Sequence, residues 1–349
     1  MKHALWIAAL AACTTSSHDE PQPPPCGAPS PTDQLAQTQN QILALAIANG
    51  EIYWLDMGGI GKVSTDGAGG AGGTELVQAT SDAAFALGGF ITTGAGNVYW
   101  ADGNFPAGSV DRVAASGGAS VQIAATDEPI GIAVDDTNIY WSTFGSSANP
   151  VGTIVKQPIA GGAPVVLASN LATVGPIAID DSSVYWSDLF GAVSSVPIAG
   201  GAVRTLVPAQ FTLPPATILD GSPVGIALAD GRLYWTATPL DGKSPSTIRS
   251  VAISGGTATT IATLDTQPTG IAVDDTFVYW AEVGPITSGG LGTPPVVNQG
   301  SIRRMARDGT AAAQIVSSGA TYPVGPVVED NALYYSTGSA ATTLYRVVL

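Results

Sequence analysis

The sequence predicts an all-β fold, a β-propeller of seven four-stranded blades, with six or eight blades as the alternatives. A Tyr-Trp dipeptide or its close variant recurs along the chain at intervals of 41 to 55 residues. Around each copy, apolar and small residues alternate with a period of two, which is typical of short strands. The 43 Gly and 25 Pro residues among 349 supply turns between those strands. Repeats of about 40–50 residues with four strands each are typical of propeller blades.

The repeated dipeptide lies on the second strand of each unit. In the third unit, we predict strands A, B, C and D within residues 129–136, 138–144, 152–162 and 163–169. Every Trp outside the first twelve residues belongs to the motif, so its recurrence is not a matter of chance. The seven copies begin at Tyr53, Tyr99, Tyr140, Tyr185, Tyr234, Tyr279 and Tyr334.

Strand A alternates small with branched residues. In the third unit Gly131 and Ala133 alternate with Ile132 and Val134. Large side chains of one blade can therefore pack on small ones of the next, and adjacent side chains of strand B can point to opposite neighbours. A ring of blades covers its inner strands on both sides. This explains why only 11% of the residues are charged, against about 25% in an average soluble domain.

Two kinds of turn recur between the strands. A Gly-Gly or Asp-Gly pair is predicted to close most C–D hairpins. An Asp or Asn four residues before the Tyr is expected to bind the backbone of the A–B hairpin through its side chain. These residues are Asn49, Asp136, Asp181, Asp230, Asp275 and Asp330. Basic residues concentrate on strand C, where we expect partly exposed salt bridges of little individual strength.

The last unit lacks its fourth strand, because the chain ends at Leu349 after strand C. Residues 32–38 precede the first strand A, and their Leu35 lies at nearly the distance from Tyr53 that a strand D residue would have. We therefore predict that residues 32–38 complete the last blade and close the ring. Closure removes the open edge that an incomplete propeller would expose.

The first 31 residues are predicted to lie outside the propeller domain, which spans 32–349. Residues 1–12 carry Lys2 and an apolar run too short to span a bilayer, which indicates a signal peptide. The sequence Leu-Ala-Ala-Cys ending at Cys13 resembles a bacterial lipobox, which implies lipidation of Cys13. Residues 13–31 are a Pro-rich tether. The alternatives are an ordinary secretory cleavage or a disulfide between Cys13 and Cys26.

Lipoproteins that are retained in the inner membrane typically have Asp directly after the lipidated Cys, whereas this chain has Thr14 after Cys13. The resemblance therefore implies an exported protein that is lipid-anchored to the outer membrane. The blade motifs YWLD, YWAD and YWSD also resemble those of the YWTD propellers of lipoprotein-receptor ectodomains and their bacterial relatives, over residues 32 to 349. That family typically has six blades, and the calcium-binding EGF modules that accompany it in animals are absent here. The resemblance implies a propeller and transfers no ligand.

Connection lengths predict which face of the ring binds a partner. The A–B and C–D connections are nearly constant, whereas the B–C and D–A connections range from 6 to 22 and from 8 to 19 residues. Binding residues usually lie on variable loops of a rigid scaffold. Aromatic side chains there could stack on a sugar or anchor a peptide, and the acids could hold Ca²⁺ or form local hydrogen bonds. The candidate residues are Asp56, Asp102, Phe105, Phe144, Asp188, Phe211, Glu282 and Tyr322.

Several function classes are excluded or disfavoured by composition. A net charge of −15 argues against nucleic acid as a partner. The two histidines, His3 and His18, both precede the propeller domain, which also lacks Cys, so a Ser-His-Asp triad or a thiol nucleophile is not expected. The sequence favours a monomeric binding or scaffold module for an envelope protein, peptide or glycan. The alternatives are a hydrolase or lyase that uses rim carboxylates, and a purely structural envelope lipoprotein.

Overall fold

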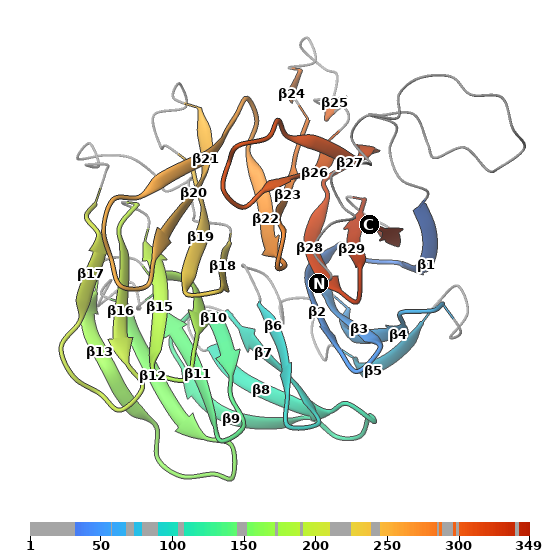
Figure 1. Ribbon diagram of the computed structural model, residues 1–349. Coiled ribbons are helices and arrows are strands. Elements are labelled where there is room, and N and C mark those ends of the chain that lie inside the picture. The colour runs from blue at the N-terminus through green and yellow to red at the C-terminus, as the bar shows by residue number, and fades with distance from the viewer. Residues whose placement is uncertain are drawn as a thin grey trace, which may run out of the picture.

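The protein folds as a closed ring of seven β-sheets (Figure 1). The computed structural model describes residues 32–56, 58–67, 73–78, 90–103, 108–144, 152–171, 174–188, 191–209, 225–238, 245–284, 286–287, 296–297, 300–338 and 342–349. Within these residues every regular element is a strand, and seven sheets have four antiparallel strands each. The prediction of a seven-bladed propeller is confirmed. The predicted signal peptide, Cys13, the tether, Phe105 and Phe211 lie outside the described residues.

The first four blades follow one another along the chain. Blade 1 contains β2 (Ile42–Ala48), β3 (Glu51–Asp56), β4 (Gly59–Ser64) and β5 (Thr74–Gln78). Blade 2 contains β6 (Ile91–Gly94), β7 (Asn97–Asp102), β8 (Gly108–Ala114) and β9 (Val121–Thr126). Blade 3 contains β10 (Pro129–Val134), β11 (Asn138–Thr143), β12 (Gly152–Pro158) and β13 (Val165–Leu171). Blade 4 contains β14 (Val174–Ile179), β15 (Ser183–Asp188), β16 (Val193–Pro197) and β17 (Arg204–Val207).

The remaining three blades complete the ring. Blade 5 contains β18 (Ile226–Ala229), β19 (Arg232–Ala237), β20 (Ser246–Ala252) and β21 (Thr259–Leu264). Blade 6 contains β22 (Pro268–Val273), β23 (Phe277–Glu282), β26 (Gly300–Ala306) and β27 (Gln314–Ala320). Between its strands B and C lies a small extra hairpin of β24 (Ile286–Thr287) and β25 (Val296–Val297). Blade 7 contains β28 (Val324–Glu329), β29 (Ala332–Thr337), β30 (Thr342–Val348) and β1 (Thr32–Thr38).

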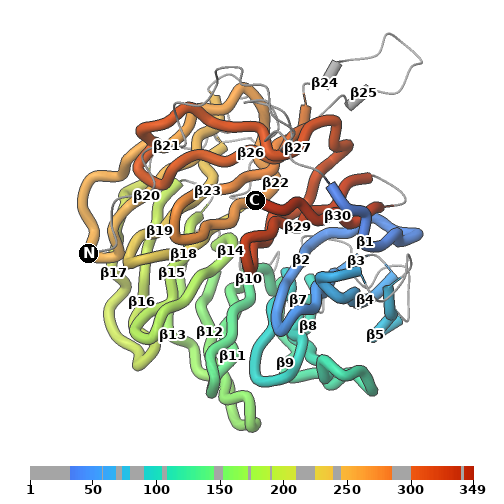
Figure 2. The backbone as a smooth tube through the Cα atoms, turned by 45° about the vertical axis from the view of Figure 1, so that its right-hand side comes forward, coloured from blue at the N-terminus to red at the C-terminus, as the bar shows by residue number. Residues whose placement is uncertain are grey.

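Blade 7 joins the two ends of the propeller domain. Strand β1 pairs antiparallel with β30, with Thr32 opposite Val347 and Thr38 opposite Thr342, and Figure 2 shows the two strands side by side. Leu35 of β1 is only 4% exposed. The Thr342 Oγ1 hydroxyl donates to the Asn40 carbonyl at 2.9 Å and accepts from the Ile42 amide at 3.1 Å, which joins blade 7 to blade 1. The predicted closure is confirmed.

The core lies between the blades. Tyr140 packs in one cluster with Ile177 and Trp186 of the next blade, whereas Trp141 packs with Tyr99 of the preceding blade. Adjacent side chains of a strand point to opposite faces, so each Tyr-Trp pair serves two interfaces. Small residues on strand A allow this stacking. A Cβ atom on Gly131 would lie 2.8 Å from the Ile177 amide nitrogen, inside the normal contact distance.

The A–B hairpins have one length but two constructions. In blades 3, 4 and 6 a carboxylate five residues before the Tyr caps the turn: Asp135 Oδ1 accepts from the Thr137 and Asn138 amides, both at 2.7 Å. Asp180 and Asp274 do the same in their blades. The prediction that the acid four residues before the Tyr caps the hairpin was wrong for Asp136, Asp181 and Asp275, which are exposed neighbours of the capping acids.

The other four hairpins turn through two residues of positive φ. These pairs are Asn49-Gly50, Ala95-Gly96, Asp230-Gly231 and Asp330-Asn331, with φ between 45° and 73°. Such two-residue turns match the twist of the flanking strands. Asn49, Asp230 and Asp330 therefore supply the backbone conformation of these turns, and the Asp230 carboxylate also pairs with Arg307 at 2.7 Å.

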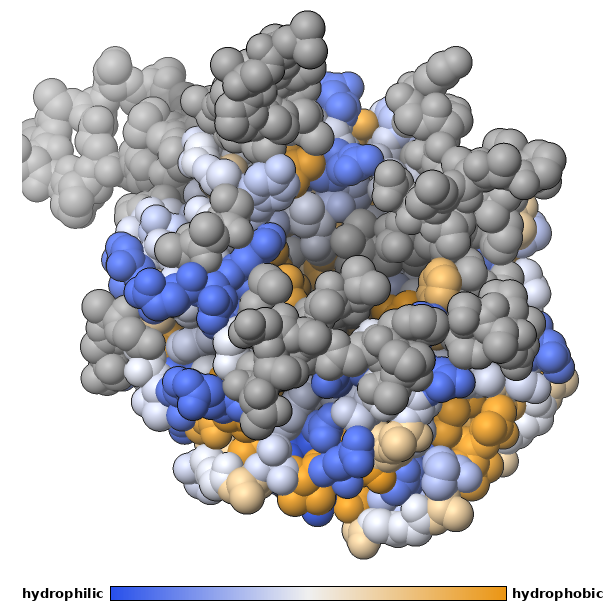
Figure 3. Space-filling view, turned by 180° about the vertical axis from the view of Figure 1, so that it is seen from behind, coloured by the Kyte–Doolittle hydropathy of each residue, from blue (hydrophilic) through white to orange (hydrophobic). Residues whose placement is uncertain are grey.

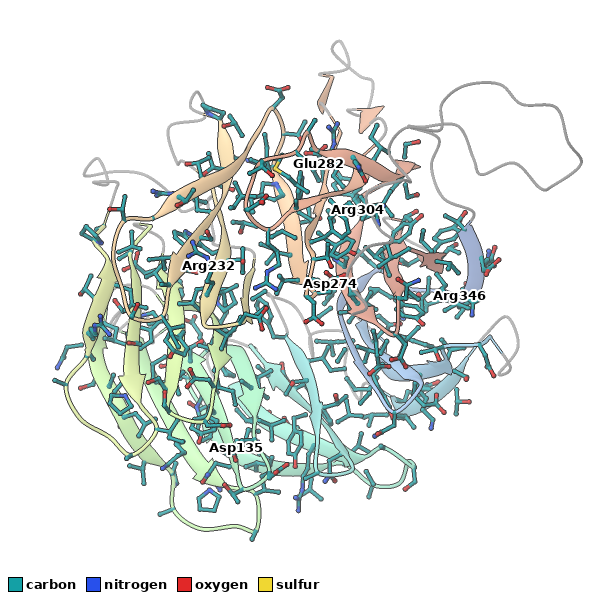
Figure 4. The ribbon with its side chains drawn as sticks, viewed as in Figure 1. Asp135, Arg232, Asp274, Glu282, Arg304 and Arg346 are labelled. Atoms are coloured by element: carbon teal, nitrogen blue, oxygen red, sulfur yellow. The ribbon has the colours of Figure 1, made fainter. Side chains whose placement is uncertain are left out.

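Three of the cations on strand C connect one blade to the next. Lys156 Nζ donates to the Ile198 carbonyl at 2.7 Å, and Arg112 Nη1 donates to the Ile159 carbonyl at 3.4 Å, each on the C–D turn of the next blade. Arg346, labelled in Figure 4, reaches the Thr65 carbonyl in blade 1 at 3.0 Å and also pairs with Asp33 of β1. Salt bridges were expected at all these sites, and that expectation was wrong for Lys156 and Arg112. Both side chains donate instead to backbone carbonyls in the C–D turn of the next blade.

Candidate functional site

The A–B and C–D turns form one face of the ring, which we call the turn face. In every blade a backbone amide of the C–D turn, or its equivalent at the end of blade 7, donates to a carbonyl of the A–B turn at 2.9 to 3.1 Å. The donor residues are Thr65, Ala115, Ile159, Ile198, Ile253, Arg307 and Leu349. The turn face therefore repeats one hydrogen bond seven times, which explains its constant connection lengths.

The B–C and D–A connections form the opposite face, which we call the loop face. Its rim is held where the end of strand B meets the preceding corner of the same blade. The Phe144 amide donates to the Glu128 carbonyl at 3.0 Å, and the Val283 amide donates to the Gln267 carbonyl at 3.1 Å. These hydrogen bonds fix the strand ends at the loop face, and connections of unequal length join those ends.

Two of the predicted acids cap local turns at this rim. Asp56 Oδ1 accepts from the Gly58 amide at 2.6 Å, and Asp188 Oδ1 accepts from the Ala192 amide at 2.9 Å. Each carboxylate belongs to the last residue of strand B and holds the start of the B–C connection. These contacts favour local hydrogen bonding over metal binding for both residues.

Glu282 is buried at the end of β23 (Figure 4). Its Oε1 accepts from the Ser301 hydroxyl at 2.9 Å and forms an ion pair with Arg303 Nε. Arg303 Nε also donates to Ser301 Oγ at 3.1 Å. The side chain of Arg303 is 38% exposed, so this group presents a positioned guanidinium between blades 5 and 6.

Blade 2 places an acid where blade 6 places that guanidinium. Asp102 and Ser109 face each other across β7 and β8 as Glu282 and Ser301 do across β23 and β26. Asp111 holds the position of Arg303, opposite the motif Trp. Ser109 donates to Asp111 Oδ2, and burial raises the pKa of Asp111 despite that bond. Within the described parts of the chain, no three acidic, His or Cys side chains gather to hold a metal ion.

Two of the predicted aromatic residues lie at the rim. Phe144 is half-buried directly after β11. Tyr322 is 36% exposed in the corner before β28. Its φ of 45° is unusual for a bulky residue, particularly before a proline, here Pro323. Glu128 has a φ of 37° before Pro129 in the corresponding corner of blade 3. Strained corners of this kind concentrate at binding sites, and their conformation is not visible in the sequence.

A separate exposed feature is apolar and lies on the outer edge of the ring. Val121, Val165, Val166 and Val203 are each more than 40% exposed. Figure 3 shows hydrophobic residues gathered toward the lower right, the side on which β13 lies in that view. Register shifts interrupt the pairing of β12 with β13. Such bulges discourage the addition of a further strand, and we assign no partner to this edge.

Solved structures with this fold cover most of the chain. Two structures of virginiamycin B lyase from Staphylococcus aureus match at 14% identity, with TM-scores of 0.63 and 0.64, and cover 91% of this chain and 99% of theirs. The hydrazine synthase of Kuenenia stuttgartiensis matches at 11% identity and a TM-score of 0.55, over 75% of each chain. A nidogen/laminin complex matches at 18% identity and a TM-score of 0.49, over 65% of this chain and 80% of that one. At 11–14% identity, the virginiamycin B lyase and hydrazine synthase matches show a shared fold alone.

Comparison with protein-family models and with curated proteins finds no match to this sequence. Among the residues that the structure covers, no helix has the length and apolar character needed to cross a bilayer.

Proposed function

We propose that the protein is an exported, lipid-anchored binding module whose loop face recognises an envelope protein, peptide or glycan. One observation carries the proposal: the turn face repeats a single hydrogen bond in all seven blades, whereas the loop face supports connections of very different length. In blade 1, β3 ends at Asp56 and β4 begins at Gly59. In blade 6, β23 ends at Glu282 and β26 begins at Gly300. A rigid scaffold with one varied face is the usual arrangement for recognition.

The direction of β1 supports the choice of face. Thr32 pairs with Val347, near the point where the Leu349 amide donates to the Asn331 carbonyl on the turn face. A tether ending at residue 31 therefore meets the ring at the turn face. An anchor at Cys13 leaves the loop face turned away from the point of attachment.

A lyase function is the second candidate, because the virginiamycin B lyase structures cover nearly the whole ring. One of them is a histidine-to-alanine variant described as catalytically inactive, in complex with quinupristin. This chain has no histidine after His18. Since a histidine matters to that lyase, its absence from residues 32–349 favours binding over the same chemistry.

The recognition test compares variants on the two faces. Tyr322→Ala and Phe144→Ala remove the rim aromatics, and Asp181→Ala removes an exposed acid on the turn face as the control. Each protein, spanning residues 14–349, is tested on peptide and glycan arrays and with envelope extract. We expect a ligand that the parent and Asp181→Ala retain and the two rim variants lose by at least tenfold, about 1.4 kcal/mol. Equal retention by all four proteins would assign recognition elsewhere.

The anchoring test is independent of the ligand. Cells expressing the full chain are labelled with radioactive palmitate, with Cys13→Ser as the variant and Cys26→Ser as the control. We expect label and membrane association in the parent and in Cys26→Ser alone. Label that survives Cys13→Ser would reject Cys13 as the lipidated residue.

A further inference from the structure

The interface between blades 2 and 3 contains a buried tyrosine hydroxyl without a partner. In blades 3, 4 and 6 the motif Tyr donates to the capping carboxylate, as Tyr140 does to Asp135 Oδ2 at 2.7 Å. In blade 5, Tyr234 accepts from Arg307 Nε at 3.0 Å. Tyr99 of blade 2 is fully buried, yet its hydroxyl has no hydrogen-bond partner among the residues that the structure describes. The reason is local, because Gly94 stands where blades 3, 4 and 6 have the capping Asp.

Gln157 of blade 3 is the second buried group without a partner. It is 6% exposed, and its Oε1 has no hydrogen-bond partner within the described part of the chain. It lies on β12 opposite Ile139, two residues beyond the residue that pairs with the motif Trp. The same position in the other six blades is apolar, held by Val63, Val113, Val196, Val251, Met305 and Val347. A polar residue at this one position requires an explanation.

Both groups belong to the same interface. Tyr99 forms one buried cluster with Ile139, Trp141 and Val155 of blade 3, and Ile159 packs against it. Gln157 lies on β12, two residues after Val155 and two before Ile159 of the C–D turn, and pairs with Ile139 across the strands. Arg112, the cross-strand partner of Tyr99, reaches the Ile159 carbonyl in the same region. The shared cluster and the strand register therefore place both residues at the interface between blades 2 and 3, toward the turn face.

We propose that one small neutral molecule, water in the simplest case, binds between blades 2 and 3 and bridges Tyr99 Oη to Gln157 Oε1. A buried polar group without a partner is strongly unfavourable, and one bridging molecule would satisfy both. The unpartnered atom of Gln157 is a carbonyl oxygen, so the ligand must donate a hydrogen bond, which excludes an anion that carries no proton. Unpaired indole nitrogens recur at Trp141, Trp235 and Trp280, so they are not particular to this interface.

The test is a double-mutant cycle with Tyr99→Phe and Gln157→Met, followed by chemical denaturation. Methionine is chosen because Met305 occupies this position in blade 6. If a molecule bridges the two groups, each single variant raises the equilibrium constant of unfolding by about fivefold. The double variant then raises this constant by much less than the product of the two single-variant factors. Without a bridging molecule, Gln157→Met removes an unpartnered carbonyl and stabilises the protein, and the two effects multiply.

A matched pair and a crystal structure make the result specific. The Tyr279 hydroxyl donates to Asp274 at 2.6 Å in a different interface. The stability effects of Tyr279→Phe and Gln157→Met should therefore be additive in free energy. The crystal structure should show density within hydrogen-bond distance of both Tyr99 Oη and Gln157 Oε1. A direct Tyr99–Gln157 hydrogen bond, or no density between them, would overturn the proposal even if the cycle shows coupling.

Discussion

Two adjacent aspartates in blade 3 should differ sharply in their effect on stability. Asp135 and Asp136 are consecutive, similar in sequence context, and both near the exposed turn face. We expect Asp135→Ala to destabilise the protein strongly and Asp136→Ala to leave it nearly unchanged. The comparison tests whether the acid five residues before the Tyr holds the hairpin.

The expected magnitude follows from the hydrogen bonds of Asp135. Its carboxylate accepts from the Thr137 amide at 2.7 Å, the Thr137 hydroxyl at 2.9 Å, the Asn138 amide at 2.7 Å and the Tyr140 hydroxyl at 2.7 Å. Loss of a capping side chain costs about 1 kcal/mol. Leaving the hydroxyl of buried Tyr140 without a partner costs about 1–3 kcal/mol more. We therefore expect a loss of about 2–4 kcal/mol for Asp135→Ala, and less than about 0.5 kcal/mol for exposed Asp136→Ala.

Guanidinium denaturation followed by tryptophan fluorescence measures both variants, because each motif Trp is buried between blades. Asp180→Ala and Asp181→Ala form the equivalent pair in blade 4, where Asp180 accepts from the Tyr185 hydroxyl at 2.8 Å. The reasoning is refuted if Asp136→Ala costs as much as Asp135→Ala, or if the blade 4 pair shows the opposite order.

Three further predictions concern pH, closure and packing. Burial raises the pKa of Asp135 and Asp180, but hydrogen bonds from the neighbouring Tyr, the hairpin amides and a hydroxyl outweigh it, so each pKa lies below its ordinary value of 3.8. A depressed pKa stabilises the fold above the unfolded-state value, so this contribution should be lost as pH falls from about 4 through the folded pKa values. The double variant Asp135→Ala/Asp180→Ala should show a weaker acid dependence of its denaturation midpoint, and an unchanged dependence would count against these groups. Leu35→Ala should cost about 2–4 kcal/mol in a single unfolding transition, and deletion of residues 32–38 should lower the melting temperature further; a truncated protein that melts like the parent would contradict closure. Gly131→Ala should cost about 1–3 kcal/mol, because its Cβ would crowd the Ile177 amide and the Ser142 hydroxyl; unchanged stability in calorimetry would show that strands A are more widely spaced.

The architecture could be predicted because it depends on periodic features of the sequence. Two adjacent aromatic residues on a strand point to opposite faces of the sheet, so both faces must be buried. Stacked sheets bury both faces in every repeat of the motif. The missing fourth strand after Thr342–Val348 left one place in the ring, and Leu35 lies at the correct distance to occupy it. Such arguments use chain length and strand alternation alone, and these survive large changes in sequence.

The details of the turns could not be predicted in the same way. Asp135 and Asp136 are identical in type, and which one caps the hairpin depends on backbone angles set by tertiary contacts. The difference between Asp111 and Arg303 at one structural position became meaningful only when the register placed both opposite a motif Trp. The unpartnered Tyr99 and Gln157 lie 58 positions apart, and no local pattern connects them.

The pairing of β1 with β30 also determines when the molecule can finish folding. Arg346 and Asp33, 313 positions apart, belong to the same blade. A chain made or threaded through a membrane from its N-terminus releases β1 before the other strands and must hold it unpaired until β30 emerges. Contacts of such high sequence separation form slowly and leave strand edges exposed meanwhile. A product that lacks β30 would therefore be an open arc of six complete blades with β1 left unpaired, a species prone to aggregate or to be degraded.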